Sequence, residues 1–273
     1  MRAYDVYDAD VGCSVGTLLY YGKTRTFIIE LCDGLDEWTA PMLFTEYVKS
    51  GILTIPRMAS LTWIRERIVP PTRQNISSIL THNRLREYDE MKLLEIAEGK
   101  CAQDEMSIKR IDDLPDYVTD RARHNLTECM TLDDHRLLCF FEDDTIKMIK
   151  LTDLSEHEVR LSFSRDDIDK VLVNEALYRS CRVGSGGYYA TFNDSIDIPA
   201  LLLYTLGTSI HLTRRDFITF MAENILDTTD VCDALECSRQ NVSYLINQGK
   251  LSPIKKDIKG NLYLRGEVEK NRW

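Results

Sequence analysis

Short runs of hydrophobic and β-branched residues, separated by glycines, dominate the first part of the chain. The runs fall at residues 3–6, 15–20 and 26–31. Their length and the turn residues between them predict a small antiparallel sheet. After the third run the spacing becomes helical, and Thr39, with Pro41 in the first turn, predicts the start of a helix there.

Helical spacing returns at residues 75–80 and 88–97, and Gly99 is expected to end the second of these helices. The region is strongly basic, with six arginines and a single acid between residues 57 and 86. Two interpretations stay open for this arginine-rich segment. In the first, residues 73–75 contact phosphates or a partner protein. In the second, the segment is a solvated helix face whose arginine stems pack on apolar neighbours.

The order of these elements, with IRERIVPPTRQNISSIL followed by YDEMKLLEIAEGKCAQDEMSI, resembles the N-terminal subdomain of HipA-type toxin kinases. In that family the subdomain precedes a kinase lobe. This chain has neither a phosphate-cradling glycine loop that leads into a helix nor a kinase catalytic loop. The resemblance therefore implies that residues 1–118 form an α+β domain for protein contact rather than an enzyme.

A second small α+β domain is predicted for residues 119–212. A charged helix at 116–125 is expected to bridge to it. Its expected elements are a hairpin of strands 136–141 and 145–151, a helix near 168–173, and strands at 178–183 and 188–192. The last segment of this region, GYYATFNDSIDI at residues 187–198, is similar to the end of a small bacterial α+β domain of unknown function. Such domains are found beside helix-turn-helix proteins and in toxin–antitoxin operons. That resemblance implies no catalytic residue.

Residues 213–226 are predicted to form a linker helix. Its Phe217, Phe220 and Met221 are expected to pack under the C-terminal domain or against a second copy of the chain. No heptad repeat is sustained, so a coiled coil is not expected.

Two short helices are predicted at the start of the last domain, residues 227–273. Thr229 is expected to cap the first helix, and Ser238 the second, after a tight turn at Glu236 and Cys237. Gly249 is expected to end the second helix. The apolar positions of the two helices, which predict a shared core, are Val231, Ala234, Leu235, Val242, Leu245 and Ile246.

Polar side chains that suit DNA bases are predicted to project from the second helix. Arginine, glutamine and asparagine pair bidentately with guanine and adenine edges in the major groove. A pair of short helices whose second member carries such residues is typical of a helix-turn-helix. The candidate DNA-binding residues of this helix are Ser238, Arg239, Gln240, Asn241, Ser243 and Tyr244.

A basic hairpin is predicted after Pro253, from strand-like runs at 254–256 and 262–264. The candidates for phosphate contacts on it are Lys255, Lys256 and Lys259. The order SRQNVSYLINQGKL, hairpin and closing helix at 266–271 resembles the small winged helix-turn-helix of the MerR and excisionase type, which implies DNA binding. The alternative is a docking module of three helices that never contacts DNA.

Charge is distributed unevenly along the chain, whose net charge is −10. Residues 228–273 carry about +2, so the residues before them carry about −12. If the mildly basic C-terminal residues bind DNA, the negatively charged duplex repels the acidic remainder of the chain. The protein would therefore bind DNA in one orientation. The alternative is that the acidic surface only maintains solubility.

Few patterns favour catalysis. Residues 184–187, GSGG, precede a strand-like run and predict a turn rather than a phosphate site. The five histidines lie far apart, and the acid runs 142–144 and 166–169 are interpreted as turns and helix caps. The eight cysteines form no CxxC pair and are interpreted mostly as small buried residues, although a redox switch at Cys232 and Cys237 is an alternative. No catalytic residue, metal or cofactor is expected.

Together these patterns predict an α+β protein in which two small mixed units precede a winged helix-turn-helix. The absence of a long apolar run favours a cytoplasmic protein without membrane contact. The predicted function is a bacterial-type transcriptional regulator that binds double-stranded DNA. A homodimer is expected, because a single helix-turn-helix of this size buries little surface against DNA. The alternative is an antitoxin-like or anti-defence factor whose acidic N-terminal body binds another protein.

Overall fold

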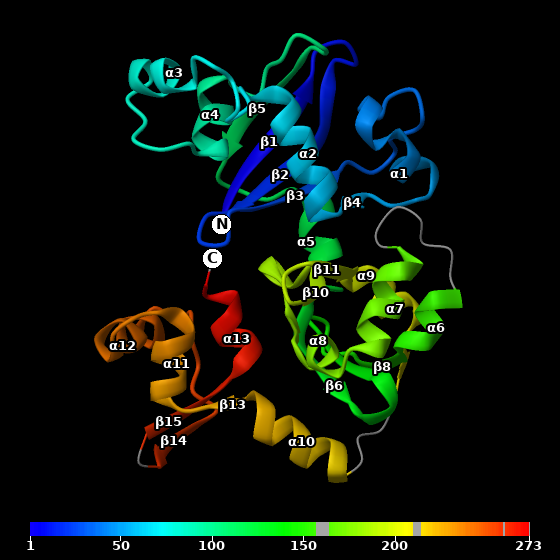
Figure 1. Cartoon of the computed structure of the whole chain (residues 1–273), viewed down its shortest axis with the longest axis vertical. Coiled ribbons are helices and arrows are strands. Elements are labelled where there is room, and N and C mark those ends of the chain that lie inside the picture. Colours follow the sequence, from blue (N-terminus) through cyan, green and yellow to red (C-terminus); the bar gives the residue numbers. More distant parts are fainter. Residues whose placement is uncertain (157–163, 210–213, 259, 273) are drawn as a thin grey trace. The chain divides into compact units, whose positions relative to one another are not determined.

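The computed structural model describes residues 1–156, 164–209, 214–258 and 260–272. The chain divides into two compact units, Met1–Asp120 and Arg121–Trp273. Each unit mixes helices with small antiparallel sheets, as Figure 1 shows. The mixed α/β composition predicted from the sequence is confirmed.

An antiparallel sheet in the order β4-β3-β2-β1-β5 is the scaffold of unit 1. The predicted N-terminal strands are confirmed, because their β-branched and aromatic residues fill a buried pleated surface. Two further strands, from distant parts of the unit, form the sheet edges. The strands are β1 (Arg2–Asp8), β2 (Cys13–Tyr21), β3 (Thr26–Leu31), β4 (Thr54–Ile55) and β5 (Met106–Ile111).

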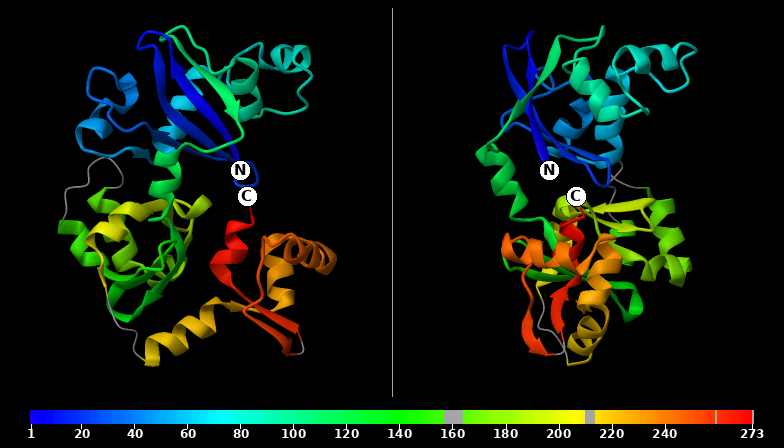
Figure 2. Two further views of the ribbon diagram at one scale, coloured as in Figure 1. Left: turned by 180° about the vertical axis from the view of Figure 1, so that it is seen from behind. Right: turned by 90° about the vertical axis from the view of Figure 1, so that its left-hand side faces the viewer.

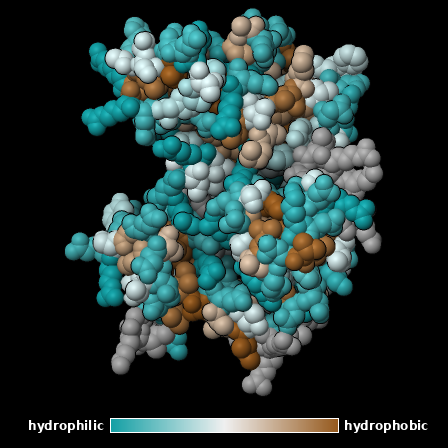
Figure 3. All heavy atoms as spheres, in the orientation of Figure 1, coloured by the Kyte–Doolittle hydropathy of each residue, from teal (hydrophilic) through white to brown (hydrophobic). Residues whose placement is uncertain are grey.

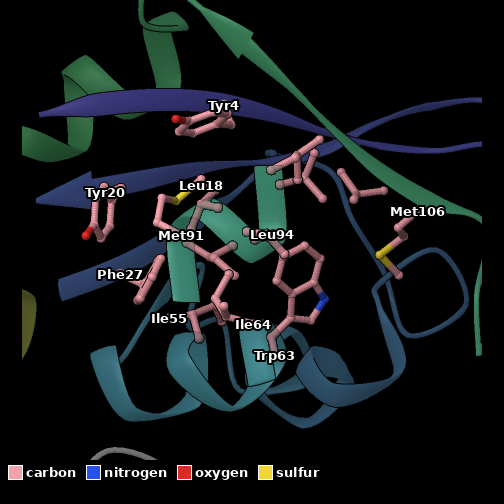
Figure 4. Packing of buried hydrophobic residues seen from close by; sticks show 14 of the residues in the cluster. Tyr4, Leu18, Tyr20, Phe27, Ile55, Trp63, Ile64, Met91, Leu94 and Met106 are labelled. Atoms are coloured by element: carbon pink, nitrogen blue, oxygen red, sulfur yellow. The ribbon is translucent and has the colours of Figure 1, made fainter. Parts of the chain in front are cut away.

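Helices pack against this sheet and complete the core of unit 1. Trp63 and Ile64 of α2 and Met91 and Leu94 of α4 lie beneath the strands in Figure 4. The helices predicted near 75–80 and 88–97 are confirmed. The helical elements are η1 (Met42–Phe44), α1 (Thr45–Lys49), α2 (Arg57–Arg67), α3 (Ile76–His82), α4 (Glu90–Ile96) and α5 (Asp116–Ala122).

The predicted helix start at Thr39 is wrong. The Asp36 carboxylate accepts hydrogen bonds from the backbone N–H groups of Trp38 and Thr39, both at 2.9 Å, and from the Thr39 hydroxyl. This side chain closes a turn before any helix forms, since a short acidic side chain competes for nearby amides. Helical structure begins three residues later, at Met42, with Pro41 as the residue before it.

One arginine of the basic segment belongs to the core. Arg67 is 6% exposed, and its guanidinium pairs with the Asp104 carboxylate and lies 3.8 Å from the centre of the Trp63 ring. By contrast, Arg73, Arg84 and Arg86 are exposed. A single interpretation therefore does not fit the whole segment: part of it is structural, and the exposed part retains both of the interpretations given above.

Replacing Arg67 with methionine is expected to destabilise unit 1 by about 3 kcal/mol, because it leaves the Asp104 carboxylate without its cationic partner. Arg65→Met is the matched control. Arg65 pairs with Glu90 at 2.8 Å, but its side chain is 59% exposed, so a loss below about 1 kcal/mol is expected. Amide hydrogen exchange of the sheet of unit 1 measures both losses. Equal effects of the two substitutions would contradict the core role of Arg67.

Unit 2 contains three small sheets, ordered β12-β8-β7-β6, β11-β10-β9 and β13-β15-β14. The predicted hairpin of residues 136–151 is confirmed by the pairing of β7 with β8. The strands are β6 (Leu126–Leu132), β7 (Arg136–Phe141), β8 (Ile146–Lys150), β9 (Cys181–Val183), β10 (Tyr189–Phe192), β11 (Ile196–Pro199), β12 (Thr208–Ser209), β13 (Ile225–Leu226), β14 (Lys255–Ile258) and β15 (Gly260–Leu264).

Short helices connect and cover these sheets. They are α6 (Leu151–Glu156), α7 (Arg165–Val173), α8 (Glu175–Arg179), α9 (Ala200–Leu206), α10 (Arg214–Asn224), α11 (Thr228–Leu235), α12 (Arg239–Asn247) and α13 (Arg265–Lys270), with 3-10 turns η2 (Asp133–His135) and η3 (Ser185–Gly187). The helix expected near 168–173 is present in α7. The 184–187 stretch is a turn before β10, as predicted.

The predicted strand 178–183 is wrong in its first half, where α8 lies. The Asn174 side chain caps this helix by accepting a hydrogen bond from the Leu177 amide at 3.0 Å. Tyr178 is fully buried, with its hydroxyl 2.6 Å from two carbonyl oxygens of the β6–β7 region. An aromatic residue with strand propensity is therefore held in a helix by a tertiary contact.

The linker helix α10 packs on the sheet β12-β8-β7-β6, called the middle sheet below. The Phe220 ring lies 5.1 Å from that of Phe140 and joins a small apolar cluster with Met130, Leu132 and Leu138. Phe220 therefore packs on this sheet and not under the C-terminal helices, the first of its two predicted locations. Met221 is 38% exposed, and its packing against a second copy stays a prediction. The side chain of Phe217 lies outside the described residues.

Candidate nucleic-acid interface

The C-terminal segment, residues 227–272, begins with a capped helix, α11. Its cap is Asp227 rather than the predicted Thr229. The Asp227 carboxylate accepts from the amides of Thr229 and Asp230 at 2.6 and 2.9 Å, and the Asp230 carboxylate accepts from the Asp227 amide at 2.9 Å. This reciprocal capping box satisfies three helix-end amides, which a threonine two residues later cannot do.

A tight turn separates α11 from α12. Glu236 adopts a left-handed conformation with φ 50°, and the Cys237 amide donates to the Cys232 carbonyl at 3.0 Å. Ser238 caps α12 as predicted, because its hydroxyl accepts from the Asn241 amide. Gly249, with φ 68°, ends the helix in the left-handed conformation that glycine tolerates.

The apolar faces of these elements form one small core. Val231, Val242, Leu251, Tyr263 and Val268 are buried within it. The core fixes the rotation of α12 about its axis, since Val242, Leu245 and Ile246 must face inward. In both views of Figure 2 the orange and red elements of this segment lie together.

The rotation of α12 leaves its polar residues on the outside. All six predicted positions of the second helix are exposed, and Tyr244 is 57% exposed. The visible surface is mostly hydrophilic in Figure 3. Two hydroxyls are already engaged: Ser238 caps the helix, and Ser243 donates to the Arg239 carbonyl at 3.1 Å. The side chains with donors available for a partner are therefore Arg239, Gln240, Asn241 and Tyr244.

Two residues that the sequence reading missed belong to this face. Asn247 is exposed and lies three and four residues beyond Tyr244 and Ser243, which places it on the same side of the helix. Thr229 of α11 orients the interface, because its hydroxyl accepts from the Arg239 guanidinium at 3.4 Å. Helical spacing alone would have found Asn247, whereas Thr229 required the packing of α11 against α12.

The predicted basic hairpin is present as β14 and β15, with Lys255 opposite Leu262. Lys255 is exposed. The backbone of Lys256 lies in β14, but its side chain and all of Lys259 lie outside the described residues. A third strand, β13, pairs with β15 and ties the hairpin to the end of the linker helix. Two residues make a strand too short to show a periodic pattern.

The closing helix α13, predicted at 266–271, docks on the sheet formed by β6 to β8. The Gly266 amide donates a hydrogen bond to the buried Glu128 carboxylate of β6. A Cβ atom at position 266 would overlap the Thr127 carbonyl oxygen and the Glu128 carboxylate, so only glycine fits here. At the other end of the helix, Lys270 forms an ion pair with Glu142.

Two acids, the buried Glu128 and the half-buried Glu269, mark this junction. Burial raises the pKa of Glu128 to about 8, against the opposing effect of the Gly266 amide. Burial also raises the pKa of Glu269 to about 7, although Arg265 and the amide of Val183 in β9 favour its ionised form. Each acid accepts a backbone hydrogen bond across the junction between α13 and the middle sheets, so both belong to the attachment of this helix.

Several acids of the runs 142–144 and 166–169 have partners within the protein. Asp143 accepts from the Tyr204 hydroxyl at 2.8 Å, and Glu142 pairs with Lys270. Asp167 forms a capping box with Ser164 and pairs with Lys170 at 2.8 Å. The cap at Asp167 was predicted from the sequence, whereas the tertiary contacts of Glu142 and Asp143 were not.

Three cysteines that are scattered in the sequence meet in unit 2. The Cys129 sulfur lies 3.8 Å from that of Cys139 and 3.7 Å from that of Cys181. Cys129 and Cys139 are buried and sit opposite each other on β6 and β7, and both serve as apolar core residues. Cys232 and Cys237 are half-buried and pack against the C-terminal core. The prediction that most of the eight cysteines are buried is wrong, because only Cys129 and Cys139 are buried and Cys13 is exposed.

Among the described residues, no group of three or more histidine, cysteine or acidic side chains is placed to hold a metal ion. Within the same ranges, no helix has both the length and the apolar composition that crossing a bilayer demands. No protein-family model, curated protein or solved structure matches the chain.

Proposed function

We propose that the C-terminal segment is a winged helix-turn-helix of the MerR and excisionase type, that it binds double-stranded DNA, and that the protein is a non-enzymatic transcriptional regulator. In this proposal α12 enters the major groove and the β14–β15 hairpin lies along the backbone. Arg239, Gln240 and Asn241 contact base edges or adjoining phosphates. The upstream parts serve protein contact or sensing.

One observation carries the proposal: the polar face of α12 is exposed while its apolar face fills the core. Any amphipathic surface helix exposes a polar face, and what favours DNA here is that this face carries arginine, glutamine and asparagine, the side chains that read base edges. The local charge supports the same orientation, since the C-terminal residues are mildly basic and the remainder is acidic. A single segment of this size covers a short site, so the proposal includes a homodimer on a repeated sequence.

Alanine replacement of both Arg239 and Gln240 tests the proposal. Double-stranded fragments are first selected from a random pool with the full chain, and the affinity of the enriched sequence is then measured. Loss of two base-reading side chains is expected to weaken binding about 10- to 100-fold and to relax the selected sequence. Arg110→Ala, on an exposed position of β5, is the control and is expected to leave binding unchanged.

Lys255→Ala tests the hairpin separately. Loss of one phosphate contact is expected to weaken binding to all sequences alike and to lower the slope of affinity against salt by about one. No enrichment of any duplex by the intact chain, at low salt, would refute DNA binding.

A second candidate function, an antitoxin-like interaction factor, is favoured by a different observation. Trp38 and Met42 precede α1 and are 83% and 93% exposed, which is unusual for large apolar residues. Here the C-terminal segment would be a docking module. This candidate replaces the first if the unaltered chain binds a protein partner but no DNA, and the Arg239/Gln240 double variant loses that partner.

A further inference from the structure

A small pocket opens at one end of the core of unit 1. Its volume is about 230 Å³, which suits a single side chain or a small molecule. Tyr20, Phe27 and Met91, labelled in Figure 4, form its apolar walls together with Tyr88. The rings of Tyr20 and Phe27 are 4.8 Å apart. Aromatic faces and a thioether line the space that an aliphatic stem would occupy.

The Tyr20 hydroxyl faces this pocket without a partner. The residue is only 5% exposed, and its hydroxyl forms no hydrogen bond with any described residue. By contrast, the hydroxyl of Tyr88 donates to the Val69 carbonyl at 2.8 Å. The hydroxyl oxygen remains accessible to water, and a donor group that enters the pocket would replace that water.

Two carboxylates at the mouth supply further acceptors. Asp89 caps α4 with one oxygen, and its other oxygen lies 3.7 Å from the Lys92 ammonium. Glu90 accepts from Arg65 with Oε1 only, at 2.8 Å. The side chains of Asp89 and Glu90 are 22% and 20% exposed, so their remaining oxygens are poorly hydrated.

The single cation among the lining residues is already engaged. The Arg25 guanidinium pairs with Glu87 at 3.3 Å. The pocket therefore offers three acceptors, the Tyr20 hydroxyl and one oxygen each of Asp89 and Glu90, and few donors. The Arg2 guanidinium already lies over the Tyr20 ring, 4.9 Å from its centre, so the ring is a surface that accepts positive charge. The carboxylates beside the aromatic walls attract a further cation.

We infer that this pocket binds an ammonium or guanidinium group on a short aliphatic stem, either the lysine or arginine side chain of a partner protein or a small free amine. The stem packs between the aromatic walls and Met91. The charged head donates to Glu90, Asp89 and the Tyr20 hydroxyl. This inference concerns unit 1 alone and does not depend on DNA binding.

The test uses the full chain labelled with ¹³C at its methionine methyl groups. The Met91 signal, assigned with Met91→Leu, is followed during titration with ethylguanidinium, n-butylammonium and, as the anionic probe, butyrate. The cations are expected to shift it in a saturable manner, and butyrate is not. No saturable shift with either cation, or an equal shift with butyrate, overturns the inference.

Variants locate the head group. Glu90→Gln is expected to weaken cation binding about tenfold, and Tyr20→Phe several-fold, because each removes one hydrogen bond to a charged donor. Arg65→Gln controls for the lost Arg65–Glu90 contact. Glu46→Gln, at an exposed position of α1, controls for the loss of a surface charge. Both controls are expected to retain binding, and unchanged binding in Glu90→Gln and Tyr20→Phe overturns the assignment.

Capped tripeptides with a central arginine or lysine distinguish the two sources of the cation. Binding at least tenfold tighter than ethylguanidinium indicates a partner's side chain. Binding no tighter than the free cations indicates a small amine, and either result supports the chemistry of the pocket.

Discussion

Gly266→Ala is expected to detach α13 from the middle sheet and to destabilise the C-terminal half of unit 2 by about 3 kcal/mol. The added methyl group would overlap the Thr127 carbonyl and the Glu128 carboxylate, and the first of these is backbone that cannot rotate away. Forcing extra atoms into a packed contact costs about 1 to 3 kcal/mol. The loss of the Gly266–Glu128 hydrogen bond adds to this cost because it leaves a buried acceptor without its donor.

The higher helix propensity of alanine opposes this destabilisation, but its contribution is smaller. Alanine favours helix over glycine by about 1 kcal/mol, so a freely exposed position would be stabilised. Gly22→Ala is the control for the same chemical change, because its added Cβ would lie 3.7 Å from the Tyr20 ring, an ordinary contact. Hydrogen exchange of residues 228–272, compared with that of unit 1, measures the effect. Unchanged protection in Gly266→Ala would show that α13 does not dock through this glycine.

Raising the pH from 5 to 9 is expected to destabilise unit 2, because burial raises the pKa of Glu128 to about 8 from an ordinary value of 4.5. Between these values the folded protein holds a proton that the unfolded chain releases. Stability contributed by this group is therefore greatest below about pH 4.5 and is lost as the pH rises towards 8. The full loss is about 5 kcal/mol, of which about 4 kcal/mol falls between pH 5 and 9. Glu269, with a pKa of about 7, acts in the same direction.

Glu128→Gln is expected to flatten much of this pH dependence. Its neutral amide can still accept the Gly266 hydrogen bond through its carbonyl oxygen but cannot ionise. The variant should therefore unfold at a higher denaturant concentration than the natural protein at pH 9, with little difference at pH 5. Glu223→Gln, which changes an exposed carboxyl in the same unit, should leave the profile unaltered. A natural protein whose stability rises between pH 5 and 9 would contradict the sign.

The docking of α13 couples the two predictions to the proposed function. The helix packs on the core that orients α12 and also on the sheet that carries Glu128. Substitutions at this junction are therefore expected to affect the proposed DNA interface indirectly, and Arg239→Ala and Gln240→Ala should leave protection of α13 intact. This contrast separates loss of contact from loss of fold.

Local chemistry predicted much of the structure from the sequence. The strands of residues 3–31 followed from short β-branched and aromatic runs between glycines, and the hairpin of 136–150 from alternation and a turn, all of which depend only on neighbouring residues. Ser238 and Gly249 were identified as the ends of α12 because capping is also local. The exposure of Arg239 and its neighbours followed from the apolar spacing of the same helix.

Sequence patterns failed where a residue's role depends on a distant partner. Thr39 and Thr229 were misplaced as caps because Asp36 and Asp227 accept from the backbone amides of these same threonines, so the turn or helix is closed from an earlier residue. Tyr178 has strand propensity but is held in a helix by two carbonyls more than forty residues away. The two-residue strand β13 has no pattern of its own, and its pairing with β15 alone defines it.

The sequence by itself determined the polar face of α12 and the elements that carry it, since capping and helical periodicity act within a few residues. Only the tertiary structure decided that Arg67 is a core residue, that Gly266 and Glu128 meet, and that the Tyr20 hydroxyl opens onto a pocket with Asp89 and Glu90. Burial, desolvation and charge pairing depend on which distant segments come together, and those contacts exist only after the chain has folded.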